Sequence, residues 1–217
     1  MTVVRFRHGP LWNFSYLIAC EATGEAAVID PAWDVPAILT EANTRGLGIT
    51  NALLTHAHSD HANGLAEIVA TTGAQVVLHD AEARLAIAQL GDLPTTFRHV
   101  DEFVLGEIAV RLVCTPGHTQ GSVCFWAGGR LFTGDSMNVA SPGTPGPEPG
   151  SLAMLWESTQ VLRSLPPDTV LCPGHDSGPM PQSTLSAELR LNPAFTASSL
   201  EEFRAAVERA TGRSHPH

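Results

Sequence analysis

A dense group of metal-binding side-chain types is the feature that most constrains this chain. The segment 55–64 holds three histidines and one aspartate within six residues: His56, His58, Asp60 and His61. An apolar run at 52–54 precedes the group and a helical pattern at 65–70 follows it, so the group lies where a strand ends and a helix begins. Such junctions in α/β proteins are where ligands usually bind. Imidazole and carboxylate groups suit zinc, iron or manganese, so the segment predicts a metal site.

Length and composition indicate a globular protein with a sizeable core. The chain has 217 residues, of which 43% are hydrophobic and 16% charged. That length allows one large domain or two small ones. No linker divides the chain, so we expect one domain over 1–217, in which 182–217 forms a short C-terminal helical extension.

The charge and the apolar pattern exclude two classes of partner. The formal net charge of −10 argues against nucleic acid, which requires a basic face. No apolar run reaches the roughly 20 residues of a membrane span, and residues 1–7 lack the apolar core of a signal peptide. The cysteines at 20, 114, 124 and 172 are widely spaced and lie in or beside apolar runs, which predicts buried free thiols. We therefore expect a cytoplasmic protein.

Strand-like and helix-like segments alternate along the chain. We expect strands at 3–7, 15–20, 26–30, 51–55, 76–78, 103–105, 108–113, 123–126, 130–133 and 169–172. We expect helices at 34–42, 61–72, 81–90, 151–163, 182–190 and 199–210. The Pro- and Gly-rich stretch 136–150 should be a loop. This order predicts two sheets packed face to face, with helices outside.

Four strand-like runs end in a metal-binding residue type beside small residues. The four residues are His56, His118, Asp135 and His175. The glycines beside them permit sharp turns and close approach of the backbone. If these strand ends converge, seven candidate ligands meet: His56, His58, Asp60, His61, His118, Asp135 and His175. Seven is too many for one tetrahedral zinc ion and suits two ions that share a bridging ligand.

The order of these motifs resembles that of the metallo-β-lactamase superfamily. The chain carries HxHxDH at 56–61, PGH at 116–118, GD at 134–135 and PGH at 173–175. The resemblance covers nearly the whole chain and implies a four-layer αββα sandwich of class α/β. It also implies a division of the ligands: His56, His58 and His118 on one ion, Asp60, His61 and His175 on the other, with Asp135 bridging both.

Two branches of that superfamily fit the local motifs. TPGHTQGS at 115–122 and FTGDS at 132–136 are similar to the glyoxalase II and persulfide dioxygenase group. Residues 174–193 and the short tail are closer to the dioxygenase side, because glyoxalase II has a longer C-terminal helical region that grips glutathione. Both branches usually carry a GCG-plus-basic motif after the GD aspartate, where this chain has MNVASPG at 137–143. The departure bears on glutathione recognition.

Three functions follow from this pattern. The first is a metal-dependent hydrolase that uses a hydroxide held by two divalent ions, taken as zinc, on a thioester or ester; Asp60 would bind metal and orient the nucleophile. The alternative is a persulfide dioxygenase with one iron, held by a residue of the cluster together with His118 and Asp135. The least favoured is a non-catalytic metal-binding module, because all seven ligands are intact. The substrate would be a small molecule such as a thiol conjugate, and a homodimer is left open.

Several residues outside the ligand set have candidate roles. Asp30 either accepts a hydrogen bond from an imidazole or caps the end of its strand. In the early loop 12–14, Asn13 is a candidate substrate contact, with core packing as the alternative. Asn138 is a second candidate, because its loop follows Asp135. Arg190 either binds the substrate or belongs to a solvated helix face. The tryptophans at 33 and 156 are expected in the core.

Overall fold

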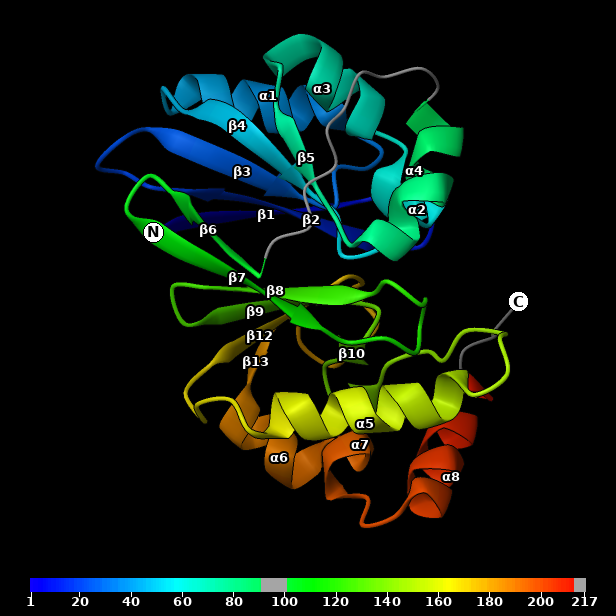
Figure 1. Cartoon of the computed structure of the whole chain (residues 1–217). Helices are drawn as coiled ribbons and strands as arrows, with labels where there is room; N and C mark the ends of the chain where they lie inside the picture. Colours follow the sequence, from blue (N-terminus) through cyan, green and yellow to red (C-terminus); the bar gives the residue numbers. More distant parts are fainter. Residues whose placement is uncertain (91–100, 213–217) are drawn as a thin grey trace.

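The computed structural model describes residues 1–90 and 101–212, and its strands form two large sheets (Figure 1). The first sheet has the order β1-β2-β3-β4-β5, where β1–β3 are antiparallel and β3–β5 are parallel. Its strands are β1 (Thr2–His8), β2 (Asn13–Ala19), β3 (Glu25–Ile29), β4 (Gly48–Leu53) and β5 (Gln75–Val77).

The second sheet has the order β13-β12-β9-β8-β7-β6. Its strands are β6 (Glu102–Leu105), β7 (Ile108–Cys114), β8 (Val123–Ala127), β9 (Arg130–Gly134), β12 (Val170–Pro173) and β13 (Ser183–Thr184). Only β9 and β12 pair in parallel here. The stretch predicted as a loop contains a small separate ladder, β10 (Met137–Asn138) with β11 (Ser141–Pro142).

Helices cover the outer faces of both sheets (Figure 1). On the side of the first sheet these are α1 (Val35–Thr44), α2 (Ser59–Ala62), α3 (Leu65–Thr72) and α4 (Ala83–Leu90), which follows the short helix η1 (Asp80–Glu82). On the side of the second sheet they are α5 (Ser151–Arg163), α6 (Leu185–Leu191), α7 (Pro193–Thr196) and α8 (Leu200–Thr211). The predicted αββα sandwich is confirmed.

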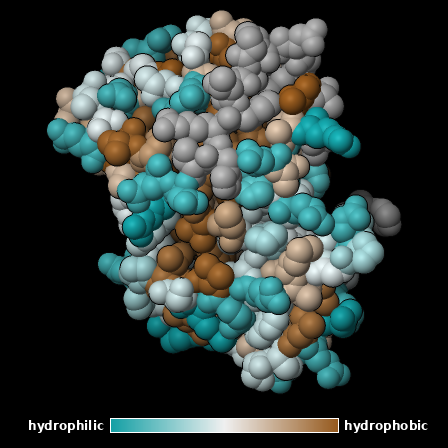
Figure 2. Space-filling view, viewed as in Figure 1, coloured by the Kyte–Doolittle hydropathy of each residue, from teal (hydrophilic) through white to brown (hydrophobic). Residues whose placement is uncertain are grey.

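The core between the sheets follows from the alternation of side chains along the strands. In β2, every residue is buried because the strand is covered on both faces. Phe14 and Ile18 point between the sheets, where they join Phe125 and Phe132, whereas Leu17 packs under the helices of the first half. A third cluster joins the second sheet to its helices and includes Leu155, Leu162, Phe195 and Phe203. On the face shown in Figure 2, hydrophobic side chains gather mainly at mid-height, over the second sheet.

Two predicted helices differ from those in the structure. The helix expected at 61–72 is two helices, α2 and α3, because the Gly64 N–H donates to the carbonyl of Pro31, 3.0 Å away, instead of continuing α2. The helix expected at 182–190 begins only at Leu185, since residues 183–184 pair with β12. Residues 213–217 of the predicted C-terminal extension lie outside the described residues. No helix in the described ranges is long and apolar enough to cross a membrane.

Two predictions of burial are wrong. Trp33 is 41% exposed, with a positive φ of 60°, and it lies in the connection before α1 instead of in the core. Cys114 is exposed. It lies at the end of β7, beyond Arg111, where the pairing of β7 with the edge strand β6 stops. The other three cysteines are buried free thiols, as predicted, and Trp156 packs on Phe203.

Candidate metal centre

The seven candidate ligands come from four chain segments that follow strand ends. The segment after β4 supplies His56, His58, Asp60 and His61, the last two from the short helix α2. His118 lies in the turn between β7 and β8, Asp135 directly follows β9, and His175 follows β12. Since β4 belongs to the first sheet and the other strands to the second, the residues meet where the two sheets come together.

The structure brings these side chains into three overlapping groups. Within each group, the nearest ligand atoms all lie within 4.8 Å of one another. The groups are His56, His58 and His118; His56, His61 and Asp135; and Asp60, His61 and His175. The first and the third are the two sets expected from the sequence. The second lies between them, because it shares one histidine with each.

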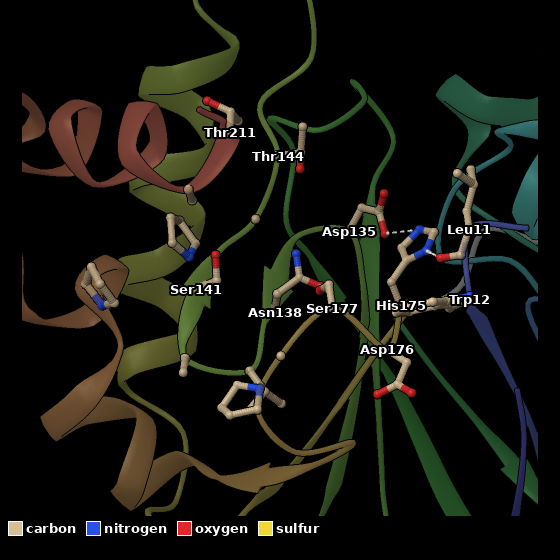
Figure 3. A pocket seen from close by; sticks show the side chains of 18 of the residues that line it. Leu11, Trp12, Asp135, Asn138, Ser141, Thr144, His175, Asp176, Ser177 and Thr211 are labelled. Atoms are coloured by element: carbon tan, nitrogen blue, oxygen red, sulfur yellow. Dashed lines mark hydrogen bonds and ion pairs between the residues drawn. The ribbon is translucent and has the colours of Figure 1, made fainter. Parts of the chain in front are cut away.

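The carboxylate of Asp135 faces both outer groups. Its Oδ2 lies 3.5 Å from Nε2 of His118, and its Oδ1 lies 3.2 Å from Nε2 of His175 and 3.5 Å from Nε2 of His61. Figure 3 shows Asp135 and His175 pointing toward one another. One oxygen for each group is the geometry that a bridging carboxylate needs.

Backbone carbonyls determine the tautomers of two of the histidines. Nδ1 of His118 lies 2.7 Å from the carbonyl oxygen of Thr144, and Nδ1 of His175 lies 3.0 Å from that of Leu11. A carbonyl oxygen can only accept, so each Nδ1 carries the proton and donates it. Each Nε2 is therefore left with a lone pair that points into the group.

Asp30 determines the tautomers of two more histidines. It is buried, and its Oδ2 lies 3.0 Å from Nδ1 of His61 and accepts a 2.7 Å hydrogen bond from the Thr55 hydroxyl. Because that hydroxyl donates its hydrogen bond to Asp30, it accepts one from Nδ1 of His56, 3.1 Å away. In the neutral form of each ring, Nε2 is thus the unprotonated nitrogen. The proposed support of an imidazole by Asp30 is confirmed, and its other oxygen also accepts from the Thr55 N–H at 2.8 Å.

Imidazole nitrogens face one another at two places. Nε2 of His61 lies 3.1 Å from Nε2 of His175, and Nε2 of His118 lies 2.9 Å from Nδ1 of His58. For the first pair, two neutral rings would both carry their protons on the outer nitrogens and could not hydrogen-bond to each other. A cation would remove the repulsion, and neighbouring ligands of a tetrahedral zinc with bonds of 2.0–2.1 Å are about 3.3 Å apart. The spacing therefore fits a metal ion.

Two buried polar atoms of the candidate ligands also lack a hydrogen-bond partner among the described residues. They are Nε2 of His56 and Oδ1 of Asp135. Buried polar atoms are nearly always paired, so each such case needs an explanation. Here both atoms point at the centre of the three groups, where bound metal would satisfy them.

The pKa shifts differ among the candidate ligands. Burial, together with His61, lowers the pKa of His56 well below its usual value, so this ring is neutral. Burial raises the pKa of Asp135, but His61 and His175 outweigh it and hold that pKa well below the usual value. Burial lowers the pKa of His61, but Asp135 and the hydrogen bond to Asp30 outweigh it and raise the pKa to about 9. With protein groups alone, the cluster therefore holds a proton that an ion would displace.

Backbone packing also brings the ligand segments close together. A Cβ added at Gly174 would lie 2.8 Å from Cε1 of His61 and 3.0 Å from Oδ1 of Asp135, so only glycine fits.

A buried carboxylate links the segments that carry the first group. Glu82 accepts from the N–H groups of Ala57 at 2.9 Å and Gly121 at 3.0 Å. Glu82 therefore joins the two segments that carry the first group, a role with no mark in the sequence.

The cluster opens into an elongated cavity of about 940 Å³. At one end lie four of the candidate ligands: His58, Asp60, Asp135 and His175. At the other end lie residues 209–211 of α8, and residues 138–144 line the cavity between them. Figure 3 shows this course, with Asp135 and His175 on one side, Thr211 on the other, and Asn138 and Ser177 between.

The three candidate substrate residues occupy different places. Asn138 lines the cavity, and its Oδ1 accepts a 3.3 Å hydrogen bond from Ser177. Asn13 is 1% exposed, begins β2, and is not among the lining residues. Arg190 is exposed at the end of α6 and is also absent from the lining. The lining includes Arg209 instead, which sequence patterns do not connect with the metal ligands.

The wall of the cavity is held by the C-terminal helical region. The buried carboxylate of Glu188 accepts from the N–H of Ala140 at 2.8 Å. The amide of Asn192 donates to the carbonyl oxygens of Asn138 and Ser141, both at 3.0 Å. Ala140 has a positive φ of 56°, so these bonds hold a conformation that costs energy.

Comparison with known proteins identifies the family. The family model described as metallo-beta-lactamase superfamily matches residues 9–175. The hydroxyacylglutathione hydrolase of Rhodospirillum rubrum is 34% identical over 203 residues, which cover 93% of this chain and 75% of that protein.

Two solved structures are also similar. ETHE1 from Myxococcus xanthus has a TM-score of 0.83 and 29% identity, with 100% of this chain and 93% of that chain covered. TTHA1623 in a di-iron-bound form has a TM-score of 0.74 and 30% identity, with coverage of 88% and 98%. The relatives indicate a metallohydrolase enzyme, and the match over most of its length shows that the chain belongs to the metallo-β-lactamase superfamily.

Proposed function

We propose that this protein is a dinuclear metal-dependent hydrolase that cleaves a thioester or ester. The observation that carries the proposal is the pair of three-residue groups joined by Asp135, whose two oxygens face one group each. Seven ligands in this arrangement exceed the needs of one ion. Two bound divalent ions would lower the pKa of a shared water toward neutrality and polarise the substrate carbonyl.

The residues of the chain have distinct parts in this reaction. Five imidazoles present unprotonated nitrogens to the ions, with four of their tautomers set by Asp30, Thr55 and two carbonyls. Asp60 lines the cavity, so its carboxylate can accept a hydrogen bond from the attacking water and orient it. The cavity beyond the ligands is large enough for the rest of a small-molecule substrate, such as a thiol conjugate.

The relatives support the class of substrate. Rhodospirillum rubrum hydroxyacylglutathione hydrolase acts, by its name, on an acylated thiol. We take the ions to be zinc, a Lewis acid without redox chemistry that suits hydrolysis. We place the protein in the cytoplasm, in keeping with its four free cysteines, and leave a homodimer as a further possibility for test.

A persulfide dioxygenase is the second candidate. The specific observation in its favour is the likeness to Myxococcus xanthus ETHE1, which extends over all of this chain and 93% of the other. In that case one iron would be held by two histidines and a carboxylate, with His118 and Asp135 among them.

Metal analysis and two assays separate these candidates. The protein is purified without added metal, its metal content per chain is measured, and it is tested with an acylated glutathione and with glutathione persulfide. The hydrolase predicts two ions per chain, thioester cleavage without oxygen uptake, and a loss of about 10²-fold or more in kcat for Asp60→Asn. One iron per chain with persulfide-dependent oxygen uptake would overturn the hydrolase in favour of the dioxygenase.

A further inference from the structure

The side chain of Asn13 is a buried link between a candidate ligand and a tryptophan. Its Nδ2 donates to Oδ2 of Asp60 at 3.0 Å, and its Oδ1 accepts from Nε1 of Trp33 at 3.1 Å. Asn13 itself is 1% exposed, so water does not compete for these bonds. Asn13 is also absent from the residues that line the cavity.

The two neighbours of Asn13 together determine which way its amide points. The indole of Trp33 can only donate, so it requires the amide oxygen. A carboxylate oxygen such as Oδ2 of Asp60 accepts, so it requires the amide nitrogen. Both requirements are met by one orientation, and the flipped amide would break both bonds.

Oδ2 of Asp60, the oxygen that Asn13 binds, also faces the other members of its group. It lies 3.6 Å from Nε2 of His61 and 3.6 Å from Nε2 of His175. A hydrogen bond to this atom therefore fixes the rotation of the carboxylate in the direction that metal binding needs.

The backbone around Asn13 is joined to a second ligand of the same group. Asn13 forms an isolated antiparallel bridge with His175. The Phe14 N–H donates to the carbonyl of Gly174 at 2.7 Å, and the Asp176 N–H donates to that of Trp12 at 2.9 Å. Asn13 thus holds His175 through the backbone and Asp60 through its side chain.

Trp33 is held in place although its ring is partly exposed. The backbone N–H of Trp33 donates to Oδ1 of Asn63, 2.7 Å away; Asn63 follows the histidine cluster in the chain. Its ring packs so closely on Gly9 that an added Cβ there would lie 2.5 Å from Nε1. Its backbone has a φ of 60°, which costs energy outside glycine and is typical of functional sites.

We propose that Asn13 is a positioning residue for Asp60, and that Trp33 fixes the orientation of the Asn13 amide. This inference rests on the proposed dinuclear site, because it concerns the ion bound by Asp60, His61 and His175. It assigns Asn13 a role in metal binding in place of substrate contact. It also explains why an exposed tryptophan lies beside the cluster: its indole N–H serves the metal site.

Three variants test the link through metal binding, with no need for a substrate. They are Asn13→Ala, which removes the amide; Asn13→Asp, which sets a second carboxylate against Asp60; and Trp33→Phe, which keeps a ring but removes the donor. The matched control is Trp126→Phe, since Nε1 of Trp126 has no partner among the described residues and lies in β8. Metal-free protein is titrated with cobalt(II), and the visible absorption is followed for each equivalent.

We expect both Asn13 variants to bind one equivalent as the wild type does, and the other about 10–100-fold more weakly, as with other groups that orient a ligand. Trp33→Phe should weaken the same equivalent, and Trp126→Phe should change neither. If the wild type binds two equivalents and all variants match it, the role of Asn13 is refuted while the dinuclear site stands. If the wild type binds only one, the dinuclear function fails, and the role of Asn13 falls with it.

Discussion

Asp30→Asn is a nearly isosteric change at the residue that sets two tautomers of the metal cluster. In the structure, Oδ1 of Asp30 accepts from the Thr55 N–H, and Oδ2 accepts from the Thr55 hydroxyl and faces Nδ1 of His61. An asparagine has only one oxygen. Because the backbone N–H of Thr55 cannot become an acceptor, that oxygen stays in the Oδ1 position, and the amide nitrogen takes the Oδ2 position.

The amide nitrogen then reverses the hydrogen bonds at both histidines. It donates toward Nδ1 of His61, so that ring must carry its proton on Nε2, the nitrogen that faces His175. It also donates to the Thr55 hydroxyl, which then gives its own proton to Nδ1 of His56. The proton of that ring moves to Nε2 as well. One substitution therefore blocks one nitrogen in each of the two proposed metal sites.

The expected magnitude follows from these bonds. Changes in groups that orient a metal ligand cost about 10–100-fold in affinity, or about 1.4–2.7 kcal/mol for each ion. Removing a buried hydrogen-bond partner outright lowers the free energy of unfolding by about 1–3 kcal/mol. Asp30→Asn should lower that of the metal-free protein by less, because the amide still bonds to all the partners of Asp30. The effect should thus be larger on metal affinity than on the stability of the metal-free chain.

Zinc affinity is measured by competition with a chromophoric chelator, and the unfolding of metal-free protein by urea denaturation. The matched control is Asp34→Asn, because Asp34 caps α1 by accepting from the Ala37 N–H at 3.1 Å, and asparagine caps equally well. We expect the control to bind zinc like the wild type. Wild-type affinity for both ions in Asp30→Asn would refute the tautomer argument, whatever its stability.

Three further substitutions or measurements test other parts of the structure. Glu82→Gln should lower the free energy of unfolding by about 1–3 kcal/mol in urea denaturation, because the amide has one oxygen and its NH₂ group would face the backbone N–H of either Ala57 or Gly121. An unchanged free energy of unfolding would contradict this role of Glu82. Cys114 should react with a thiol reagent in the folded protein, whereas Cys124, whose pKa burial raises to about 12, should react only after unfolding; equal rates would contradict the burial of the second thiol. Gly134→Ala should lower the thermal midpoint by about 2–4 °C for each kcal/mol of stability lost, because the added methyl would collide with the hydroxyl of Thr55 and because Gly134 has a φ of 47°. Gly129→Ala is the control: its φ is 74° and the space around it is open, so it shares only the backbone strain.

The positions of the candidate ligands could be predicted because they depend on local pattern. Strand ends are marked by apolar runs that stop at small residues, and the carboxyl ends of strands that run in the same direction lie at one edge of a sheet. The histidines after β4 and the single residues at 118, 135 and 175 therefore came together as expected. The two-sheet architecture followed from the same alternation of strands and helices.

Apart from the hydrogen bond of Asp30 to a histidine, the contacts that orient these ligands could not be predicted, because they join segments that only the packed sheets bring together. Asn13 lies in a stretch that reads as a loop, yet β2 begins there and meets the end of β12. Trp33 looked like a core residue by type, but its positive φ turns the ring outward onto Gly9. Glu82 and Glu188 look like ordinary surface carboxylates until the backbone N–H groups that they bind are placed.

The origin of the ligands in both sheets links metal binding to folding. Asp30, Asn13 and the residues 56–61 belong to the first half of the chain, whereas the residues at 118, 135 and 175 follow strands of the second sheet. Bound ions would therefore connect the two halves, and ions that bind only the folded chain stabilise it in proportion to the logarithm of their concentration over Kd. A change in a buried hydrogen bond, such as that of Asp30, would then lower the stability of the loaded protein mainly through the ions it fails to hold, since the metal-free chain keeps most of its contacts. The same coupling explains why so many buried polar groups surround the cluster: they keep the ligands of two separate sheets aligned before any ion arrives.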